Sequence, residues 1–164
     1  MIEPMPSLPV ILDVDTGVDD ACALLLAALH PSLDLRAVTC VGGNAPLADV
    51  VRNTLTVLET AGRRDVPVGV GAARPLLEEP VDARHVHGAD GMADLGMPAP
   101  TLAPDPRPAI DLLRDTIDHA AAEGDPVTVV PLAPMTTLAL LARVHPDAFA
   151  RLGRVVFMGG GVHT

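Results

Sequence analysis

Lysine, tyrosine and tryptophan are absent from this sequence of 164 residues, and phenylalanine occurs only twice. With so few aromatic rings, single-stranded nucleic acid would find almost no surface on which its bases could stack. The net charge of −10 also repels polyanions, because the eleven basic residues, all arginine, are outnumbered by 21 acidic ones. We therefore expect no nucleic-acid partner.

Long hydrophobic runs are missing too. No apolar run reaches the roughly 20 residues of a membrane-spanning helix, and the N-terminal "MIEPMPSLP" lacks the basic and apolar regions of a signal peptide. The only two cysteines, Cys22 and Cys40, fall in apolar segments, where we expect core residues rather than a disulfide or a zinc site. A cytoplasmic protein with no membrane partner is expected.

What the sequence does contain is an alternation of short apolar segments with longer helical ones. The expected strands span residues 9–14, 34–41, 66–71, 127–132 and 154–161, and the expected helices 19–29, 44–61, 108–123, 135–143 and 147–152. Asn44 is expected to cap the second helix. Because the strands are continuously apolar, we predict an α/β fold: an open, mostly parallel sheet with helices on both faces, formed by a single domain over residues 1–164.

In open parallel sheets, ligands bind at the carboxyl ends of the strands. Asp15 and Asn44 come just after expected strands, Leu132 ends another, and "MGGG" from Met158 ends the last, so these residues are predicted to lie at one edge of the sheet. The segment 72–107 contains many prolines and glycines and shows no clear period. A segment of this length inside a compact domain is usually functional or mobile, so we expect an active-site loop.

The stretch "VILDVDTGVDDA", residues 10–21, places four aspartates next to a buried strand. Helix capping accounts for one of them, since the helix dipole favours an anion at the N-terminus. Asp15 and Asp20 can converge on one point across a turn at Gly17, and hard carboxylate oxygens around a shared point suit Ca²⁺ or Mg²⁺. Asp13 lies on the same strand face as Asp15 and is expected to support it.

One alternative reading starts from the same aspartates. An apolar strand ending in D-x-D-T resembles the opening motif of the Mg²⁺-dependent haloacid-dehalogenase-like phosphotransferases, with Asp13 as nucleophile and Asp15 as acid and base. That chemistry normally uses a downstream lysine, and this chain has none. The pair Asp19 and Asp20 would also be unexplained.

"ILDVDTGVDDA" also resembles the D-x-D-P-G-x-D-D signature of the nucleoside hydrolases of the inosine–uridine-preferring type. Four further blocks follow in the family's order: "AVTCVGGN", "HVHGADGM", "VVPLAPMTTLA" and "VVFMGGG". Thr16 stands where the family usually has proline, and Thr137 where asparagine is common. The resemblance extends over nearly the whole chain and implies the Rossmann-like core of that family.

The resemblance implies calcium-dependent hydrolysis of the N-glycosidic bond of a ribonucleoside, yielding free base and ribose. Asp15 would bind Ca²⁺ and act as the general base on the attacking water. Asp20 and the backbone carbonyl of Leu132 would complete the metal ligands that this chain supplies. The substrate-binding residues implied by the resemblance are Asp19 and Asn44 on the ribose hydroxyls, His87 near the base or ribose, and Met158 in the ribose pocket.

The family is about twice as long as this chain, so the resemblance covers only its N-terminal half. The second half would supply another calcium-binding aspartate and often a histidine that protonates the leaving base. We therefore expect a truncated core with little activity, or a calcium- and ribose-binding module without turnover. A sheet cut after its fifth strand exposes apolar surface, so a homo-oligomer, dimer or tetramer, is also expected.

Overall fold

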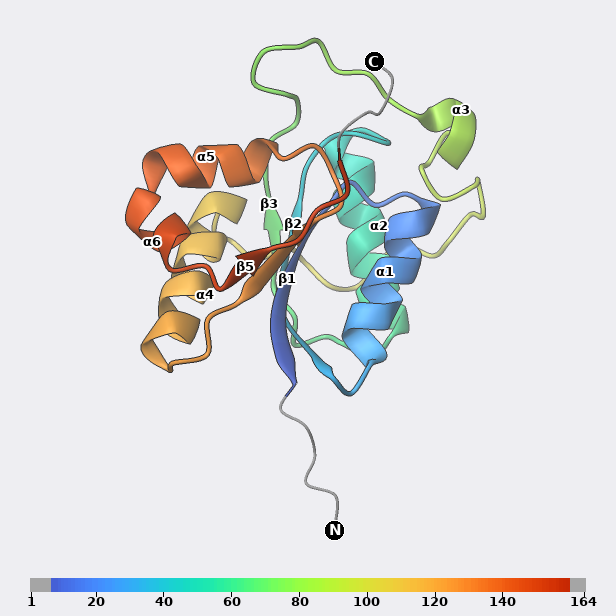
Figure 1. Ribbon diagram of the computed structural model, residues 1–164. Helices are drawn as coiled ribbons and strands as arrows, with labels where there is room; N and C mark the ends of the chain where they lie inside the picture. The colour runs from blue at the N-terminus through green and yellow to red at the C-terminus, as the bar shows by residue number, and fades with distance from the viewer. Residues whose placement is uncertain (1–6, 160–164) are drawn as a thin grey trace.

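The computed structural model describes residues 7–159 and contains one five-stranded sheet, which is entirely parallel (Figure 1). The spatial order is β3-β2-β1-β4-β5. The strands are β1 (Leu8–Val14), β2 (Leu33–Cys40), β3 (Val68–Val70), β4 (Thr128–Pro131) and β5 (Arg154–Val155). The predicted α/β class and parallel sheet are confirmed.

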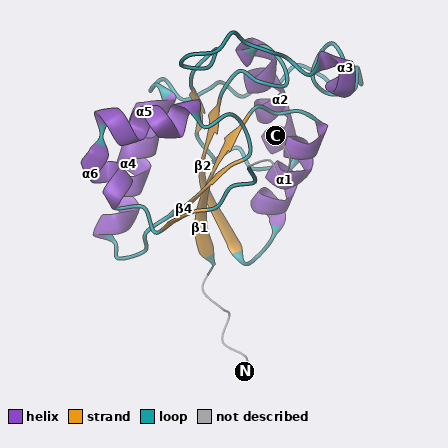
Figure 2. Cartoon of the chain, turned by 45° about the horizontal axis from the view of Figure 1, so that its top comes forward, coloured by secondary structure: helices purple, strands orange, loops and turns teal. Residues whose placement is uncertain are grey.

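Helices cover both faces of the sheet, as Figures 1 and 2 show. On one face lie α1 (Val18–Leu29) and α2 (Leu47–Thr60). On the other face lie α4 (Ala109–Ala122), α5 (Thr136–Val144) and α6 (Pro146–Ala150). The short α3 (Arg84–His87) interrupts the long segment between β3 and α4. No helix within residues 7–159 has both the length and the apolarity needed to cross a bilayer.

The central strand β1 divides the hydrophobic core in two. Val10, Leu12 and Val14 pack with α1 and α2, whereas Ile11 packs with α4 and α5. All four are at most 4% exposed, and burying each such side chain contributes about 1.5–3 kcal/mol. A strand buried on both faces is normally apolar throughout, so the buried Asp13 within β1 and Asp15 directly after it are unusual.

Three local predictions differ from the structure. The last strand was expected over 154–161, but only Arg154–Val155 is a strand; 156–159 have no regular structure, and 160–161 lie outside the described residues. Cys40 is buried as predicted, but Cys22 is exposed because it lies on the outward side of α1. Asn44 caps no helix: Pro46 occupies the N-cap of α2, and the Asn44 side chain binds an aspartate instead.

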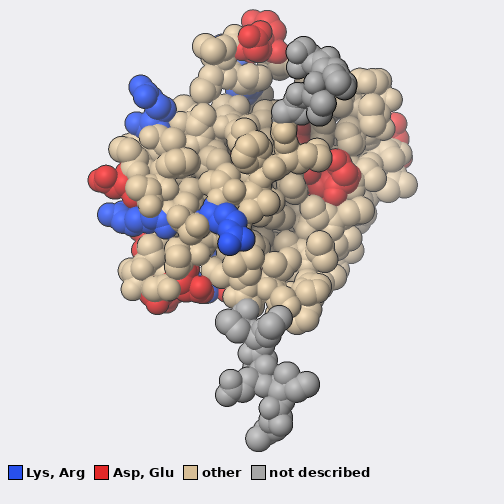
Figure 3. Space-filling model, in the orientation of Figure 1, with Lys and Arg blue, Asp and Glu red and all other residues tan. Residues whose placement is uncertain are grey.

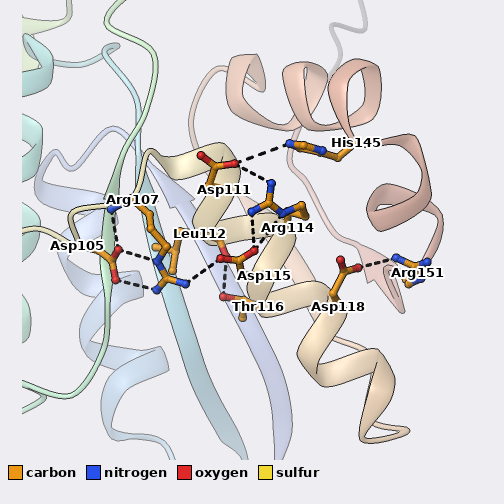
Figure 4. A network of polar contacts seen from close by, with 10 residues as sticks. All are labelled: Asp105, Arg107, Asp111, Leu112, Arg114, Asp115, Thr116, Asp118, His145 and Arg151. Carbon is orange, nitrogen blue, oxygen red and sulfur yellow. Dashed lines mark hydrogen bonds and ion pairs between the residues drawn. The ribbon is translucent and has the colours of Figure 1, made fainter.

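The long segment before α4 is tied down at its C-terminal end by charged side chains, shown in Figure 4. Arg107 bonds both Asp105 and Asp115, and Arg114 bonds Asp111 and Asp115. These side chains are only 13–43% exposed but all reach solvent, and ion pairs at the surface contribute only about 0–1 kcal/mol each. We interpret this network as fixing the start of α4 rather than as a site of chemistry.

Candidate active site

The strand order reverses between β1 and β4, and the residues leaving β1 at this point are aspartates. Such a switch point is where open α/β sheets bind ligands. Asp15 follows β1 directly, and Asp20 lies in the first turn of α1. The backbone N–H of Asp15 donates to Oδ2 of Asp20 at 2.9 Å, so the turn at Gly17 brings the two predicted metal ligands together.

The carboxylate of Asp15 is held by Asn44, which follows the neighbouring strand β2. The backbone N–H of Asn44 donates to its Oδ2 at 2.8 Å, and Asn44 Nδ2 donates to its Oδ1 at 3.2 Å. Gly43 makes this approach possible, because a Cβ there would overlap Asp15 Oδ2. The glycines after β2 therefore let the backbone cradle a carboxylate, and Asn44 orients Asp15.

Three carboxylates at this edge are almost fully buried: Asp13 is 1% exposed, Asp15 5% and Asp20 3%. Burial raises the pKa of Asp13 to about 7, although a hydrogen bond from Thr39 opposes the shift. Burial also raises the pKa of Asp15 and of Asp20, and the charge of Asp15 raises that of Asp20 further. No arginine in residues 7–159 bonds to any of the three, so their charges are uncompensated by protein.

Asp13 is enclosed behind Asp15. Thr39 Oγ1 donates to Asp13 Oδ1 at 2.6 Å, and Asp13 Oδ2 has no partner among the described residues. Thr137 Oγ1, at the start of α5, likewise makes no well-formed hydrogen bond in the described part of the chain, but it lies close enough to Asp13 to lower the pKa of that carboxyl. A carboxylate so enclosed is not open to a substrate as a nucleophile, which counts against the phosphotransferase alternative.

The long segment brings His87 back to the turn between β1 and α1. His87 Nδ1 accepts a long hydrogen bond from the N–H of Val18 at 3.4 Å and lies 3.9 Å from Asp19 Oδ1. A Cβ on Gly17 would come within 2.6 Å of the imidazole, so the ring packs directly on that glycine. The side chain of Asp19 is 75% exposed, which leaves it open to a ligand at the mouth of the site.

The two remaining predicted residues follow β4 and β5. The N–H of Leu132 donates to the carbonyl of Asp13 at 2.8 Å, so the Leu132 backbone lies at the exit of β1. Met158 is 93% exposed, and no described contact joins it to the aspartates. Its place in a ribose pocket stays a prediction, as do the ligand roles of the other site residues.

The oxygen ligands at this site are of the type that a hard divalent cation binds. Asp15 and Asp20 offer only oxygens, are buried and lack a positive partner, which is costly unless a cation joins them. The number of donors is small: within the described residues no three His, Cys, Asp or Glu side chains gather in the arrangement of a metal site. Two carboxylates and the Leu132 carbonyl fall short of the six to eight oxygens that calcium takes.

The residues that hold Asp13 and Thr16 in place at this edge of the sheet were not predicted from the sequence. Thr39 bonds Asp13, Thr54 Oγ1 lies 2.6 Å from Thr16 Oγ1, and Asn53 reaches the Thr16 carbonyl. Asn53 and Thr54 lie on α2, where adjacent buried polar residues are unusual on a core-facing helix surface. That pattern was the available signal; their partners depend on the tertiary structure.

The chain is a parallel α/β domain whose buried carboxylates, without a positively charged partner among the described residues, lie at the switch point where such sheets bind ligands. The family model "inosine-uridine preferring nucleoside hydrolase" matches residues 10–164. The chain belongs to this family, whose members are hydrolases of N-glycosyl compounds.

Individual relatives agree with the family. The pyrimidine-specific ribonucleoside hydrolase RihA of Escherichia coli strain K12 is 40% identical over 156 residues, covering 95% of this chain and 49% of the relative. A plant nucleoside hydrolase structure superposes with a TM-score of 0.88 at 34% identity, covering 95% of this chain and 49% of that one. A purine-preferring ribonucleoside hydrolase from Gardnerella vaginalis gives 0.83 at 26% identity, covering 93% and 49%. The chain spans about half the length of the curated relatives it matches.

Proposed function

We propose that this site hydrolyses the N-glycosidic bond of ribonucleosides with the help of bound calcium. The observation that carries the proposal is Asp15 itself: a buried carboxylate at the switch point, oriented by Asn44 and adjacent to Asp20. Family membership supports the reaction class. A purine or a pyrimidine base is equally compatible with these residues.

In the proposed reaction a water oxygen bonds to the anomeric carbon as the bond from that carbon to the base nitrogen breaks. The electron pair of the broken bond leaves with the base, and Asp15 takes the proton of the water. Burial raises the pKa of Asp15, which makes its carboxylate a stronger base. Direct attack by water without a covalent intermediate predicts inversion at the anomeric carbon.

The sugar carries positive charge as the bond breaks, and preorganised negative groups stabilise it. Asp15 and Asp20 supply buried negative charge. Asp19 lies exposed at the entrance of the site, where it can bind a ribose hydroxyl. The same charges disfavour a phosphate group, so nucleosides should be preferred over nucleotides.

Calcium would be held by Asp15, Asp20 and the Leu132 carbonyl. When bound, it supplies a Lewis acid that lowers the pKa of water. With so few protein donors we expect weak affinity, because the number and charge of ligands set the affinity for calcium.

The test is the release of free ribose from inosine and from uridine, measured with enzyme in excess over substrate. The whole chain should release ribose slowly, at a rate that a chelator suppresses and calcium restores. Asp15→Asn keeps the shape but removes the base, and should abolish the release. A rate that is unchanged in this variant would rule out the proposed role of Asp15.

We also propose that the chain forms a homo-oligomer. On α1 the exposed large apolar side chains are Val18, Leu25, Leu26 and Leu29, which are 37–61% exposed. The surface over α1 carries few charges in Figure 3, so it offers an apolar area that association would cover. Sedimentation velocity measures the oligomeric state, and a monomer at all concentrations would contradict this proposal.

A further inference from the structure

A buried amide joins the turn that carries Asp15 to the loop that carries His87. Asn53, on α2, is 5% exposed. Its Nδ2 donates to the carbonyl of Asp90 at 2.9 Å and to the carbonyl of Thr16 at 3.3 Å. Thr16 directly follows Asp15, and Asp90 lies three residues after His87. One side chain therefore holds two segments that are far apart in the sequence.

The chemistry of this contact requires an amide. Two carbonyl oxygens converge on one nitrogen, and only a group with two N–H donors satisfies both. The Oδ1 of Asn53 accepts from Arg52 Nη2 at 3.4 Å, and the same guanidinium lies 3.5 Å from the Asp90 carbonyl. These partners fix which way the amide faces. An aspartate of the same shape would present only acceptors to the two carbonyls.

The loop backbone packs closely on this amide. Gly91 has φ +77°, and a Cβ there would lie 3.2 Å from Asn53 Nδ2 and 3.0 Å from the Cβ of Ala45. The next residue, Met92, is 6% exposed within the core on this face. Asp90 Oδ1 accepts the N–H of Met92 at 2.7 Å, which forms a tight turn within the loop. The loop is therefore built to rest on Asn53.

We propose that Asn53 is a positioning residue, which fixes the His87 loop against the Asp15 turn so that both face one ligand. The need for such alignment rests on the proposed function, but the contact itself does not. Asn53 touches no group that reacts. Its effect on a ligand passes through Thr16 and Asp90.

Thr54, the next residue of α2, provides a matched control. Its Oγ1 lies 2.6 Å from Thr16 Oγ1 and donates to the Val50 carbonyl, and no hydrogen bond links it to the described part of the loop. Cys40 Sγ on β2 also donates to Thr54 Oγ1 at 3.3 Å. Thr54→Val therefore disturbs the turn and this contact but not the loop, whereas Asn53→Ala releases both the turn and the loop.

The experiment is amide hydrogen exchange of the whole chain, read by mass spectrometry. In Asn53→Ala the loop amides of Gly91 and Ala93 should exchange at least about tenfold faster, while those of β3 and α4 stay unchanged. Thr54→Val should leave the loop amides at the rate of the unsubstituted chain. Asn53→Asp, which keeps the side-chain volume, should behave like Asn53→Ala and serves if the alanine variant does not fold.

A second measurement follows the NMR signals of the His87 imidazole, which should shift in Asn53→Ala and not in Thr54→Val. Unchanged loop exchange, or faster exchange spread evenly over the sheet, would overturn the positioning role. Neither measurement uses a substrate. An absence of ribose release would therefore contradict the proposed function but would not bear on the positioning role of Asn53, which the exchange and NMR measurements decide.

Discussion

Raising the pH from about 5 to about 8 without metal should destabilise this protein, because its buried carboxylates must ionise. The pKa of Asp13 is about 7 in the folded chain, against roughly 4 in an unfolded one. The folded state therefore binds this proton more tightly, and the resulting stabilisation is complete below about pH 4 and lost as the pH rises through 7. Between pH 5 and pH 7 the stabilisation lost through Asp13 is on the order of 3 kcal/mol.

That change is a large share of the 5–15 kcal/mol typical of a domain, and the raised pKa values of Asp15 and Asp20 act in the same direction. Other shifted carboxylates do not interfere. Glu59 and Asp105 have a lowered pKa of about 2, chiefly through hydrogen bonds from Thr101 and Arg107. Their stabilisation is lost only as the pH falls below about 4.

The assay is urea unfolding followed by far-ultraviolet circular dichroism, since the chain has no tryptophan or tyrosine to report by fluorescence. With chelator present, the free energy of unfolding should fall steadily over this pH range. Added calcium should stabilise the chain more at pH 8 than at pH 5, because it binds the ionised carboxylates. Asp13→Asn should reduce the pH dependence, leaving the part due to Asp15 and Asp20, and Asp147→Asn, at an exposed position, should not. A flat or rising curve with chelator would refute the reasoning.

Three further predictions follow from the same site and surface. Gly43→Ala should displace the Asp15 carboxylate from the Asn44 N–H and weaken calcium binding in calorimetry, whereas Gly124→Ala, strained by φ +77° but in open space, should cost about 1–2 kcal/mol of stability without changing that binding. Asp15→Asn should bind less calcium yet unfold within about 1 kcal/mol of the unsubstituted chain, and loss of its native circular dichroism would contradict this. Leu26→Asp, on the exposed side of α1, should shift sedimentation toward the monomer, and an unchanged profile would exclude α1 from the contact.

The sheet was predictable because the strands are short, mostly apolar runs without regular alternation of polar and apolar residues, a pattern typical of parallel strands buried on both faces. The C-terminal boundary of β5 was not predictable, because "RVVFMGGG" stays apolar beyond the two residues that pair with β4. Cys22 was misjudged for a related reason. An apolar helix offers no polar stripe to indicate which side faces solvent, and α1 exposes leucines beside this cysteine.

The approach of Asp15 to Asp20 was predictable because four like charges beside a core strand need a common explanation. The partners of these aspartates were not. Asn44 has the composition of a helix cap, and only the tertiary structure places its amide on Asp15. Thr39 and Asn53 act across strands and helices, and nothing in their local sequence identifies the atoms they bond.

The central claim is that the aspartates of this chain can serve the cleavage of a ribonucleoside. The most direct measurement uses a chimera in which this chain replaces the aligned part of the Escherichia coli relative, so that the remaining half of the fold is supplied. We predict that the chimera releases ribose from uridine in the presence of calcium, and that Asp15→Asn lowers the rate by at least about 10³-fold. A folded chimera without this activity, or one whose rate is insensitive to Asp15→Asn, would contradict the account.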